Sequence, residues 1–246
     1  MQTYQIIIEY DGNKFVGWQI QKNGISIQET IEKALKKLTK KNIVIYGSGR
    51  TDAGVHAIAQ SAHFRTDYKI GHKINFIKSI NFFLIKYEIS ILDIKKKNKN
   101  FHARYSAKKR IYKYLIINRY GKLALKKNKA WNIRKKLDLE LMKKSAVILK
   151  GTRDFSTFRA SSCNSKSPIK TLENVSIKKS KNLIELTFVS QSFLQQQVRS
   201  MVGCIKYVGE KKWTLKNFKT TMLSKDRTRC APPAPAIGLY LYKVKY

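Results

Sequence analysis

The sequence predicts an α+β fold whose sheet is mostly antiparallel. Segments in which apolar residues alternate, as in strands, are mixed with segments in which they recur every three or four residues, as in helices. The two kinds do not follow the strict strand–helix–strand alternation typical of a parallel sheet, which favours antiparallel pairing. The 246 residues, of which 43% are hydrophobic, suffice for one large domain or two small, closely packed ones.

The first half of the chain is expected to begin with a strand and a helix. Residues 6–10 alternate up to the turn at Asp11-Gly12, which predicts a strand that ends there. Ser26 and Glu29 have the spacing of a capping box, and the apolar residues that follow fall on one helical face. We interpret residues 41–64 as a strand, a glycine-rich loop and a second strand.

The second half is expected to repeat this mixture of strands and helices. Residues 110–118 alternate as a strand does, and the apolar spacing near residues 139–149 predicts an amphipathic helix. A strand at 184–188 should precede a further helix from about 194 to 205. A cluster of prolines then leads into a closing strand that contains residues 237–241.

A run of charged residues near the middle suggests where the two halves join. Residues 95–99 form a Lys/Asn cluster, which we interpret as the connection. We therefore expect an N-terminal half, 1–103, and a C-terminal half, 104–246. Both halves contain a segment that combines Gly, Asp, Phe and Arg, such as residues 151–155, which is a faint indication of an internal duplication.

The charge balance indicates a polyanionic partner. The chain has 51 Lys and Arg against 15 Asp and Glu, a formal net charge of +36. A general drift towards Lys, Ile and Asn would add lysines, but it would not by itself remove acids so severely. Nucleic acid is the favoured partner, because Lys and Arg gain affinity for phosphates through counterion release. An anionic membrane surface ranks below it.

Cysteine usage and hydropathy favour a reduced, cytoplasmic location. Cys163, Cys204 and Cys230 are few, odd in number and far apart, which argues against a disulfide framework and against a zinc ribbon. The first residues lack the charged-then-apolar plan of a signal peptide. No apolar run approaches the roughly 20 residues that a membrane span needs.

Residues 47–56, Gly-Ser-Gly-Arg-Thr-Asp-Ala-Gly-Val-His, are the densest cluster of special residues in the chain. Glycines around an Arg and an Asp suit a loop whose backbone approaches a ligand closely. The simpler alternative is a tight turn in which Asp52 caps a helix or pairs with a surface Arg. Metal-dependent phosphoryl transfer, paired-carboxylate glycosidase chemistry and zinc-dependent deamination all need ligand sets or carboxylate pairs that this sequence does not gather. A single-carboxylate mechanism on a nucleic acid remains.

Residues 49–57 resemble the active-site motif of the tRNA pseudouridine synthase A family. The resemblance extends over nearly the whole chain. The chain departs from the family pattern at Gln197, where Met is usual, and at Ile85, where proline is common. Further segments that match in family order are Tyr10-Asp11-Gly12, Gly17-Trp18-Gln19, residues 62–65, 101–104 and 154–159, Val198-Arg199, and residues 238–241.

This resemblance implies both a fold and an activity. The fold would be that of pseudouridine synthases: two related α+β halves that share a mostly antiparallel sheet, with flanking helices and a basic cleft. The activity would be isomerisation of uridine to pseudouridine at positions 38–40 of the tRNA anticodon stem-loop. The reaction needs no cofactor and no metal. Family members act as homodimers, so we expect a homodimer that binds tRNA.

The resemblance also assigns roles to individual residues. Asp52 would be the catalytic group, either as a nucleophile or as a base; the sequence leaves these routes open. Arg199 would keep the carboxylate charged, or would instead bind phosphate. Arg50 would hold the flipped-out nucleotide or fill its place in the stem. Tyr112 would stack on the target uracil and help to remove the C5 proton. A strand aromatic is ordinarily a core residue, however, which is what we expect of Tyr114.

Two rival functions remain open. A non-catalytic RNA-binding or ribosome-associated protein would account for the charge but not for Asp52 in its glycine setting. A synthase that modifies another RNA would use the same residues on a different substrate. His56 and His63 lie in alternating apolar surroundings and are expected to be hydrogen-bonded sheet residues rather than ligands.

Overall fold

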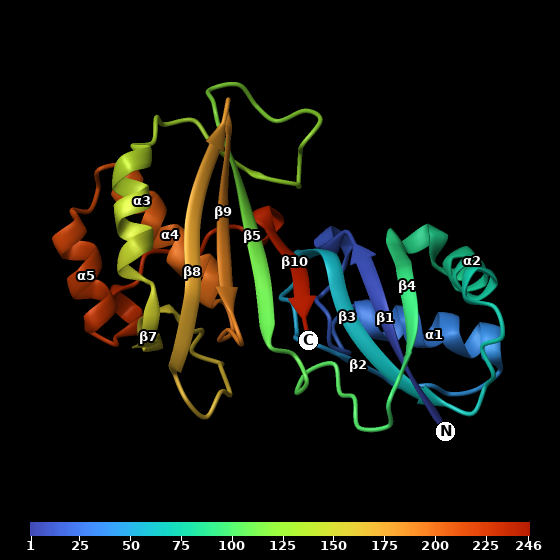
Figure 1. Cartoon of the computed structure of the whole chain (residues 1–246). Coiled ribbons are helices and arrows are strands. Elements are labelled where there is room, and N and C mark those ends of the chain that lie inside the picture. The colour runs from blue at the N-terminus through green and yellow to red at the C-terminus, as the bar shows by residue number, and fades with distance from the viewer. The chain divides into compact units, whose positions relative to one another are not determined.

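The chain forms two units in this computed structural model, which describes residues 1–246 (Figure 1). The first unit comprises Met1–Lys108 together with Tyr240–Tyr246, and the second comprises Lys109–Leu239. The last strand of the chain therefore returns to the N-terminal unit.

The first unit is a sheet with two helices. Its strands are β1 (Gln2–Tyr10), β2 (Ile45–Gly47), β3 (His56–Thr66), β4 (Ile89–Lys97) and β10 (Leu239–Lys245), in the order β4-β1-β3-β10 with β2 paired to β3. Its helices are α1 (Ile27–Thr39) and α2 (Lys73–Leu84), with 3-10 turns η1 (Gly12–Lys14) and η2 (Ile85–Tyr87). Helix α2 packs against β4 and α1.

The second unit is a sheet with three helices. Its strands are β5 (Lys109–Asn118), β6 (Trp131–Ile133), β7 (Gly151–Asp154), β8 (Ile169–Ser180) and β9 (Leu183–Ser190), in the order β5-β9-β8-β7 with β6 paired to β5. Its helices are α3 (Leu139–Ile148), α4 (Gln197–Gly209) and α5 (Leu215–Leu223), with 3-10 turns η3 (Ser156–Phe158), η4 (Arg227–Arg229) and η5 (Ala236–Gly238). Helix α3 packs against α4, α5 and β8.

Strand pairing confirms the predicted α+β class with mostly antiparallel strands. In the first unit β1–β3, β1–β4 and β2–β3 are antiparallel, and only β10–β3 is parallel. In the second unit β5–β9, β8–β9 and β7–β8 are antiparallel, and only β5–β6 is parallel. Strands β4 and β7 are each paired with a single strand and are therefore edge strands.

Helix α1 shows how the sequence specifies a local element. The Ser26 hydroxyl accepts a hydrogen bond from the Glu29 backbone N–H at 3.2 Å, which satisfies one of the free donors of the first turn. Ile27, Ile31 and Leu35 have no exposed surface, so the predicted apolar face is the buried one. Burial of such a side chain stabilises the fold by roughly 1.5–3 kcal/mol.

The predicted connection at residues 95–99 is wrong. Lysines 95–97 are not a connection, because they form the end of β4, where Gln5 lies opposite Lys95 and Thr3 opposite Lys97. Long charged side chains suit an edge strand, since they discourage further strand pairing. Helices α2 and α5 have no counterpart among the predicted elements, and α4 begins at Gln197, three residues after the expected start.

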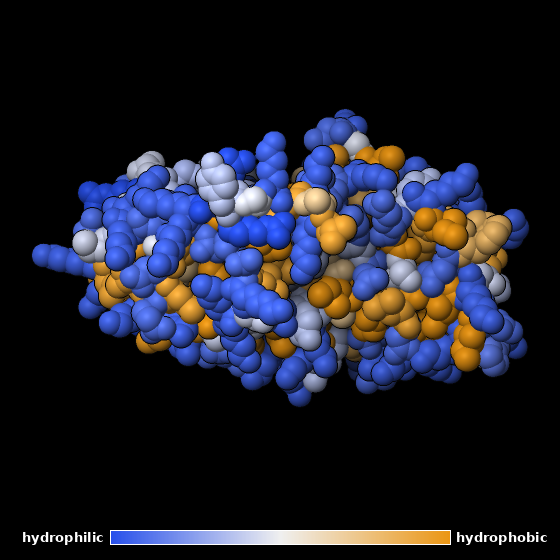
Figure 2. All heavy atoms as spheres, turned by 90° about the horizontal axis from the view of Figure 1, so that it is seen from above, coloured by the Kyte–Doolittle hydropathy of each residue, from blue (hydrophilic) through white to orange (hydrophobic).

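Polar residues cover most of the surface visible in Figure 2, while apolar residues gather at its right-hand end, on the side of α1 and α2. Exposed apolar side chains of α2 and η2 include Ile74, Phe82 and Ile85, which are 55%, 73% and 76% exposed. No helix of the chain combines the length and the apolar character that crossing a bilayer requires.

Candidate functional site

Asp52 lies in the loop that joins β2 to β3, as the sequence predicted for the glycine-rich segment. Its backbone pairs with Gly17 in an isolated antiparallel bridge, and its carbonyl accepts a hydrogen bond from the Val55 N–H at 3.1 Å. Asp52 is half-buried, and Arg50 in the same loop is exposed. The loop therefore holds the backbone of Asp52 while it leaves part of the residue accessible.

The end of β1 and the segment that follows it hold Thr51, the residue that precedes Asp52, in place. The Trp18 N–H donates to the carbonyl of Thr51 at 3.0 Å, and the hydroxyls of Tyr10 and Thr51 are hydrogen-bonded at 2.8 Å in a buried position. Gly17 has φ +117°, and a Cβ there would lie 2.7 Å from the Thr51 carbonyl oxygen. Only glycine fits this backbone conformation and this close approach without strain.

His56 supports the far end of the loop. Its Nδ1 accepts a hydrogen bond from the Gly12 N–H at 3.1 Å and lies 2.9 Å from Oδ1 of Asp11. Its ring stacks on Tyr240, with centroids 4.7 Å apart and planes at 23°. Burial, reinforced by the negative charge of Asp11, raises the pKa of Tyr240 to about 12. His56 is thus a buried, hydrogen-bonded sheet residue, as expected.

The near end of the loop is held against β3. The Ser48 hydroxyl donates to Oε1 of Gln60 at 2.7 Å, and Nε2 of Gln60 donates to the Gly49 carbonyl at 2.9 Å. Gly47 lies against the indole of Trp18, where a Cβ would come within 2.6 Å of the ring. Both ends of the Asp52 loop are therefore anchored to the rigid sheet, which is how a fold pre-organises a reactive side chain.

Tyr112 lies on β5 of the second unit. It is 8% exposed, and its ring packs edge-on against Phe193, with centroids 5.2 Å apart and planes at 87°. This T-shaped geometry is favourable for aromatic pairs, and it fixes the orientation of the ring. Tyr114, two residues on, is fully buried, as expected for a packing residue.

Arg199 lies on α4 and is tied to the proline-rich segment after η4. Its Nε donates to the carbonyl of Ala234 at 2.8 Å, and the Ala234 N–H donates to the Arg199 carbonyl at 2.9 Å. Tyr114 reaches the same segment, since its hydroxyl donates to the Pro235 carbonyl at 2.7 Å. Burial raises the pKa of Tyr114, and the positive charge of Arg199 opposes that rise.

The four expected site residues are thus divided between the two units. Arg50 and Asp52 share one loop of the first unit, and Tyr112 and Arg199 belong to β5 and α4 of the second.

Sequence reasoning did not assign the contacts that support these residues. Tyr10 was part of a matching motif, and Trp18 was expected to be a core residue or to line the floor of the site; the structure shows that both are hydrogen-bonded to Thr51. Phe193, which packs on Tyr112, was not singled out at all. Nothing in the local pattern marks these pairs, because each partner is distant in the sequence.

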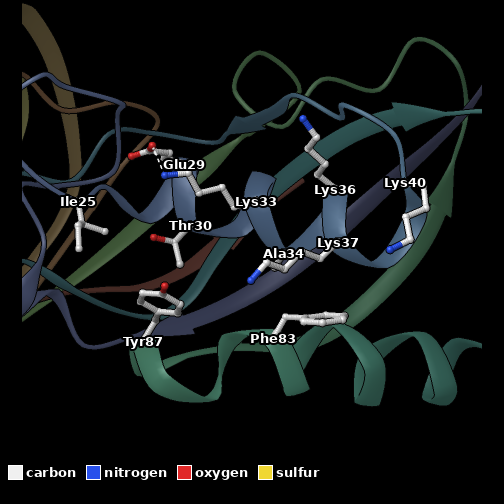
Figure 3. Close-up of a pocket in the computed structure, with 10 residues that line it drawn as sticks. All are labelled: Ile25, Glu29, Thr30, Lys33, Ala34, Lys36, Lys37, Lys40, Phe83 and Tyr87. Atoms are coloured by element: carbon white, nitrogen blue, oxygen red, sulfur yellow. Dashed lines mark ion pairs between the residues drawn. The ribbon is translucent and has the colours of Figure 1, made fainter.

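A pocket of about 530 Å³ lies between α1 and α2 and contains none of the expected site residues (Figure 3). Four of its lining residues are lysines of a single helical face that ends at Lys40. In Figure 3 the rings of Phe83 and Tyr87 face α1 across the pocket. Its basic wall adds to the positive charge of the first unit. No group of three or more His, Cys, Asp or Glu side chains is arranged to hold a metal.

Comparison with known proteins assigns the chain to a family. The family model described as tRNA pseudouridine synthase matches residues 6–106 and 145–246, which include Arg50, Asp52 and Arg199 but not Tyr112. The chain belongs to this family. It is 59% identical to the tRNA pseudouridine synthase A of Pelagibacter ubique (strain HTCC1062) over 246 residues, which is 100% of both chains.

Other relatives carry the same name. The chain is 44% identical to the tRNA pseudouridine synthase A of Ehrlichia ruminantium (strain Welgevonden), with 99% of both chains covered. It is 42% identical to that of Maricaulis maris (strain MCS10), with 100% of this chain and 98% of the relative covered. Members of this family are isomerases that convert uridine to pseudouridine, and the enzyme class expected from the sequence is confirmed.

Proposed function

We propose that this chain isomerises uridine to pseudouridine at positions 38–40 of the tRNA anticodon stem-loop, with Asp52 as the catalytic nucleophile or base. The observation that carries the proposal is the setting of Asp52. It is the acid of a loop anchored at both ends, its own backbone is bridged to Gly17, and the residue is only half-buried. The loop also lies within the part of the chain that matches the family model.

The chemistry is balanced without a redox partner. The N1–C1′ glycosidic bond breaks, the uracil turns, a C5–C1′ bond forms, and the proton on C5 is lost while N1 gains one. Asp52 would attack the sugar or the base, or remove a proton from the ribose. Each route needs the ionised carboxylate, so a nearby guanidinium would favour activity by stabilising that form.

The other site residues would bind and orient the nucleotide. Tyr112, with its ring held by Phe193, would stack on the target uracil. Arg199 would supply positive charge towards the carboxylate or a phosphate, and its Nε contact to Ala234 would hold it in place. Arg50, exposed beside Asp52, would hold the flipped-out nucleotide or fill the space it leaves in the stem.

The wider arrangement is part of the same proposal. Residues 1–103 would supply the catalytic loop, and residues 104–246 would supply further RNA-binding residues. The formal net charge of +36 would attract the tRNA backbone without sequence preference. Three free cysteines suit a reducing cytoplasm. We further propose a homodimer, which sedimentation equilibrium of the purified protein would test.

Mapping of pseudouridine in a tRNA with uridines at 38, 39 and 40 tests the substrate. The protein is incubated with this transcript and with a matched transcript in which the three uridines are cytidines. Carbodiimide modification followed by primer extension then locates the product. We expect stops at these positions in the first transcript alone. Product found only outside the anticodon arm would refute the proposed target, and tRNA binding without product would favour a non-catalytic RNA-binding protein.

A further inference from the structure

Two of the three cysteines lie side by side in the second unit although 26 positions separate them in the sequence. Cys204 lies on α4 and is fully buried, and Cys230 follows η4 and is partly exposed. Their Sγ atoms are 3.4 Å apart, and both are free thiols. The family assignment and the proposed reaction make no use of this pair.

The two thiols face each other because α4 and the η4 turn each place a cysteine on the side that faces the other element. Ser200 and Cys204 are four residues apart on α4 and therefore lie on one side of it. Arg227 and Cys230 occupy the start and the end of the η4 turn, where the Cys230 N–H donates to the Arg227 carbonyl at 3.1 Å. Nη1 of Arg227 donates to the Ser200 hydroxyl at 3.0 Å, and this bond holds the two faces together.

The environment makes the two sulfurs chemically unequal. The hydrogen bond from Cys204, helped by the positive charge of Arg227, holds the pKa of Cys230 below its usual value. The same contact and burial raise the pKa of Cys204. Cys230 is also the more exposed of the two. One thiol is therefore placed to react with an oxidant from solution, and its neighbour is placed to resolve the product.

We propose that Cys204 and Cys230 form a redox-active dithiol, a site of reversible modification by low-molecular-weight disulfides. The Cys230 thiolate would attack one sulfur of oxidised glutathione, form a mixed disulfide and release one glutathione thiolate. Cys204 would then attack the Cys230 sulfur, pass its proton to solvent and release the second glutathione. In sum, two protein thiols become one disulfide, and one glutathione disulfide becomes two thiols.

The required movement is small. A disulfide has its sulfurs about 2.05 Å apart, so the pair must close by roughly 1.4 Å from its present 3.4 Å. The moving partner, Cys230, lies outside regular helix or strand, between η4 and the proline-rich segment. A side-chain rotation with a slight shift of this segment provides such a movement.

The bond would also act on the segment that holds Arg199. That residue and Cys204 share α4, and Ala234, which exchanges two hydrogen bonds with Arg199, is four residues after Cys230. Tightening Cys230 onto α4 therefore disturbs the Arg199–Ala234 pairing. We expect the oxidised protein to lose turnover and the reduced protein to recover it; this consequence, unlike the disulfide itself, rests on the proposed function.

The test is made on the full chain, reduced and then exposed to oxidised glutathione. Remaining thiols are alkylated, and intact mass and non-reducing peptide mapping are compared with and without dithiothreitol. We expect two of the three thiols to be protected and one peptide pair to join Cys204 to Cys230, fully reversed by reductant. Three alkylated thiols, or a disulfide that contains Cys163, would overturn the proposal.

Three variants assign the steps. Cys163→Ser is the matched control and should form the same disulfide as the parent. Cys204→Ser should stop at a glutathione adduct on Cys230, and Cys230→Ser should form no intramolecular disulfide; a 204–163 bond instead would count against the proposed pair. Circular dichroism checks that each variant is folded, and the parent protein tests the proposal even where a variant is not. Unchanged turnover in the oxidised parent would refute the effect on Arg199 and leave the redox site intact.

Discussion

Replacement of Gly17 by alanine should destabilise the Asp52 loop for two separable reasons, backbone strain and a steric clash. Gly17 has φ +117°, a conformation that alanine rarely adopts, and the new Cβ would lie 2.7 Å from the Thr51 carbonyl oxygen. The positive φ costs about 1–2 kcal/mol. The overpacking against backbone adds roughly 1–3 kcal/mol. We therefore expect the Gly17→Ala protein to lose about 2–5 kcal/mol of its free energy of unfolding.

Two other glycines provide matched controls. Gly151 has φ +99° but nothing within 4 Å of an added Cβ, so Gly151→Ala isolates the backbone strain and should cost about 1–2 kcal/mol. Gly71 has open space and no strained φ, so Gly71→Ala should change stability by less than about 0.5 kcal/mol. The difference between the first two variants measures the clash with Thr51 alone.

Urea unfolding monitored by tryptophan fluorescence gives the three free energies, and pseudouridine formation gives the activity. Because the clash pushes the backbone next to Asp52, Gly17→Ala should also lower turnover under conditions where it is still folded. Gly151→Ala should not. A Gly17→Ala protein as stable and as active as Gly71→Ala would refute the account of how this loop is held.

Three further predictions concern other parts of the molecule. Burial, with His102 and Arg65 nearby, lowers the pKa of His63 to about 4. Between pH 6.5 and about 4 only the unfolded state binds this proton, so the free energy of unfolding falls on acidification by up to about 1.4 kcal/mol per pH unit. The variant His63→Asn should therefore show a flatter dependence of the urea midpoint on pH. A profile as steep as the parent's would contradict this. Tyr112→Phe keeps the ring on Phe193 but removes the hydroxyl. If the hydroxyl assists loss of the C5 proton, tritium release from 5-[³H]uridine tRNA should fall about 100-fold at unchanged tRNA affinity. Unchanged release would limit Tyr112 to stacking. Filter binding should show tRNA affinity falling by about 10³-fold or more between 50 and 200 mM salt, as expected for six or more phosphate contacts, whereas a salt-independent affinity would exclude an electrostatic interface.

Local signals in the sequence predicted the elements that depend on local physics. The Ser26 cap and the apolar face behind it located α1, and the glycines located the Asp52 loop. Helix α2 was missed because its apolar residues are not confined to one face: Ile74 and Phe82 are exposed while Ile80 is buried, so no clear helical period stands out.

Tertiary pairing accounts for the rest of what the sequence did not reveal. The lysines of β4 have the composition of a linker and become a strand only because β1 pairs with them along their length. Tyr10 and Thr51 are 41 residues apart, and no local pattern indicates that their hydroxyls meet. The candidate catalytic residue could be recognised from its loop, whereas the contacts that support it depend on the folded sheet.

Tritium release from tRNA labelled with 5-[³H]uridine tests the central claim most directly, in the parent protein, in Asp52→Asn and in a matched control, Asp67→Asn. Asp67 is an exposed carboxylate paired only with the surface residue Lys41 at 2.5 Å, so its replacement should leave activity unchanged. The account predicts release by the parent and the control, and none above background by Asp52→Asn at unchanged tRNA affinity. Release by Asp52→Asn at the parent's rate would contradict the catalytic role of Asp52.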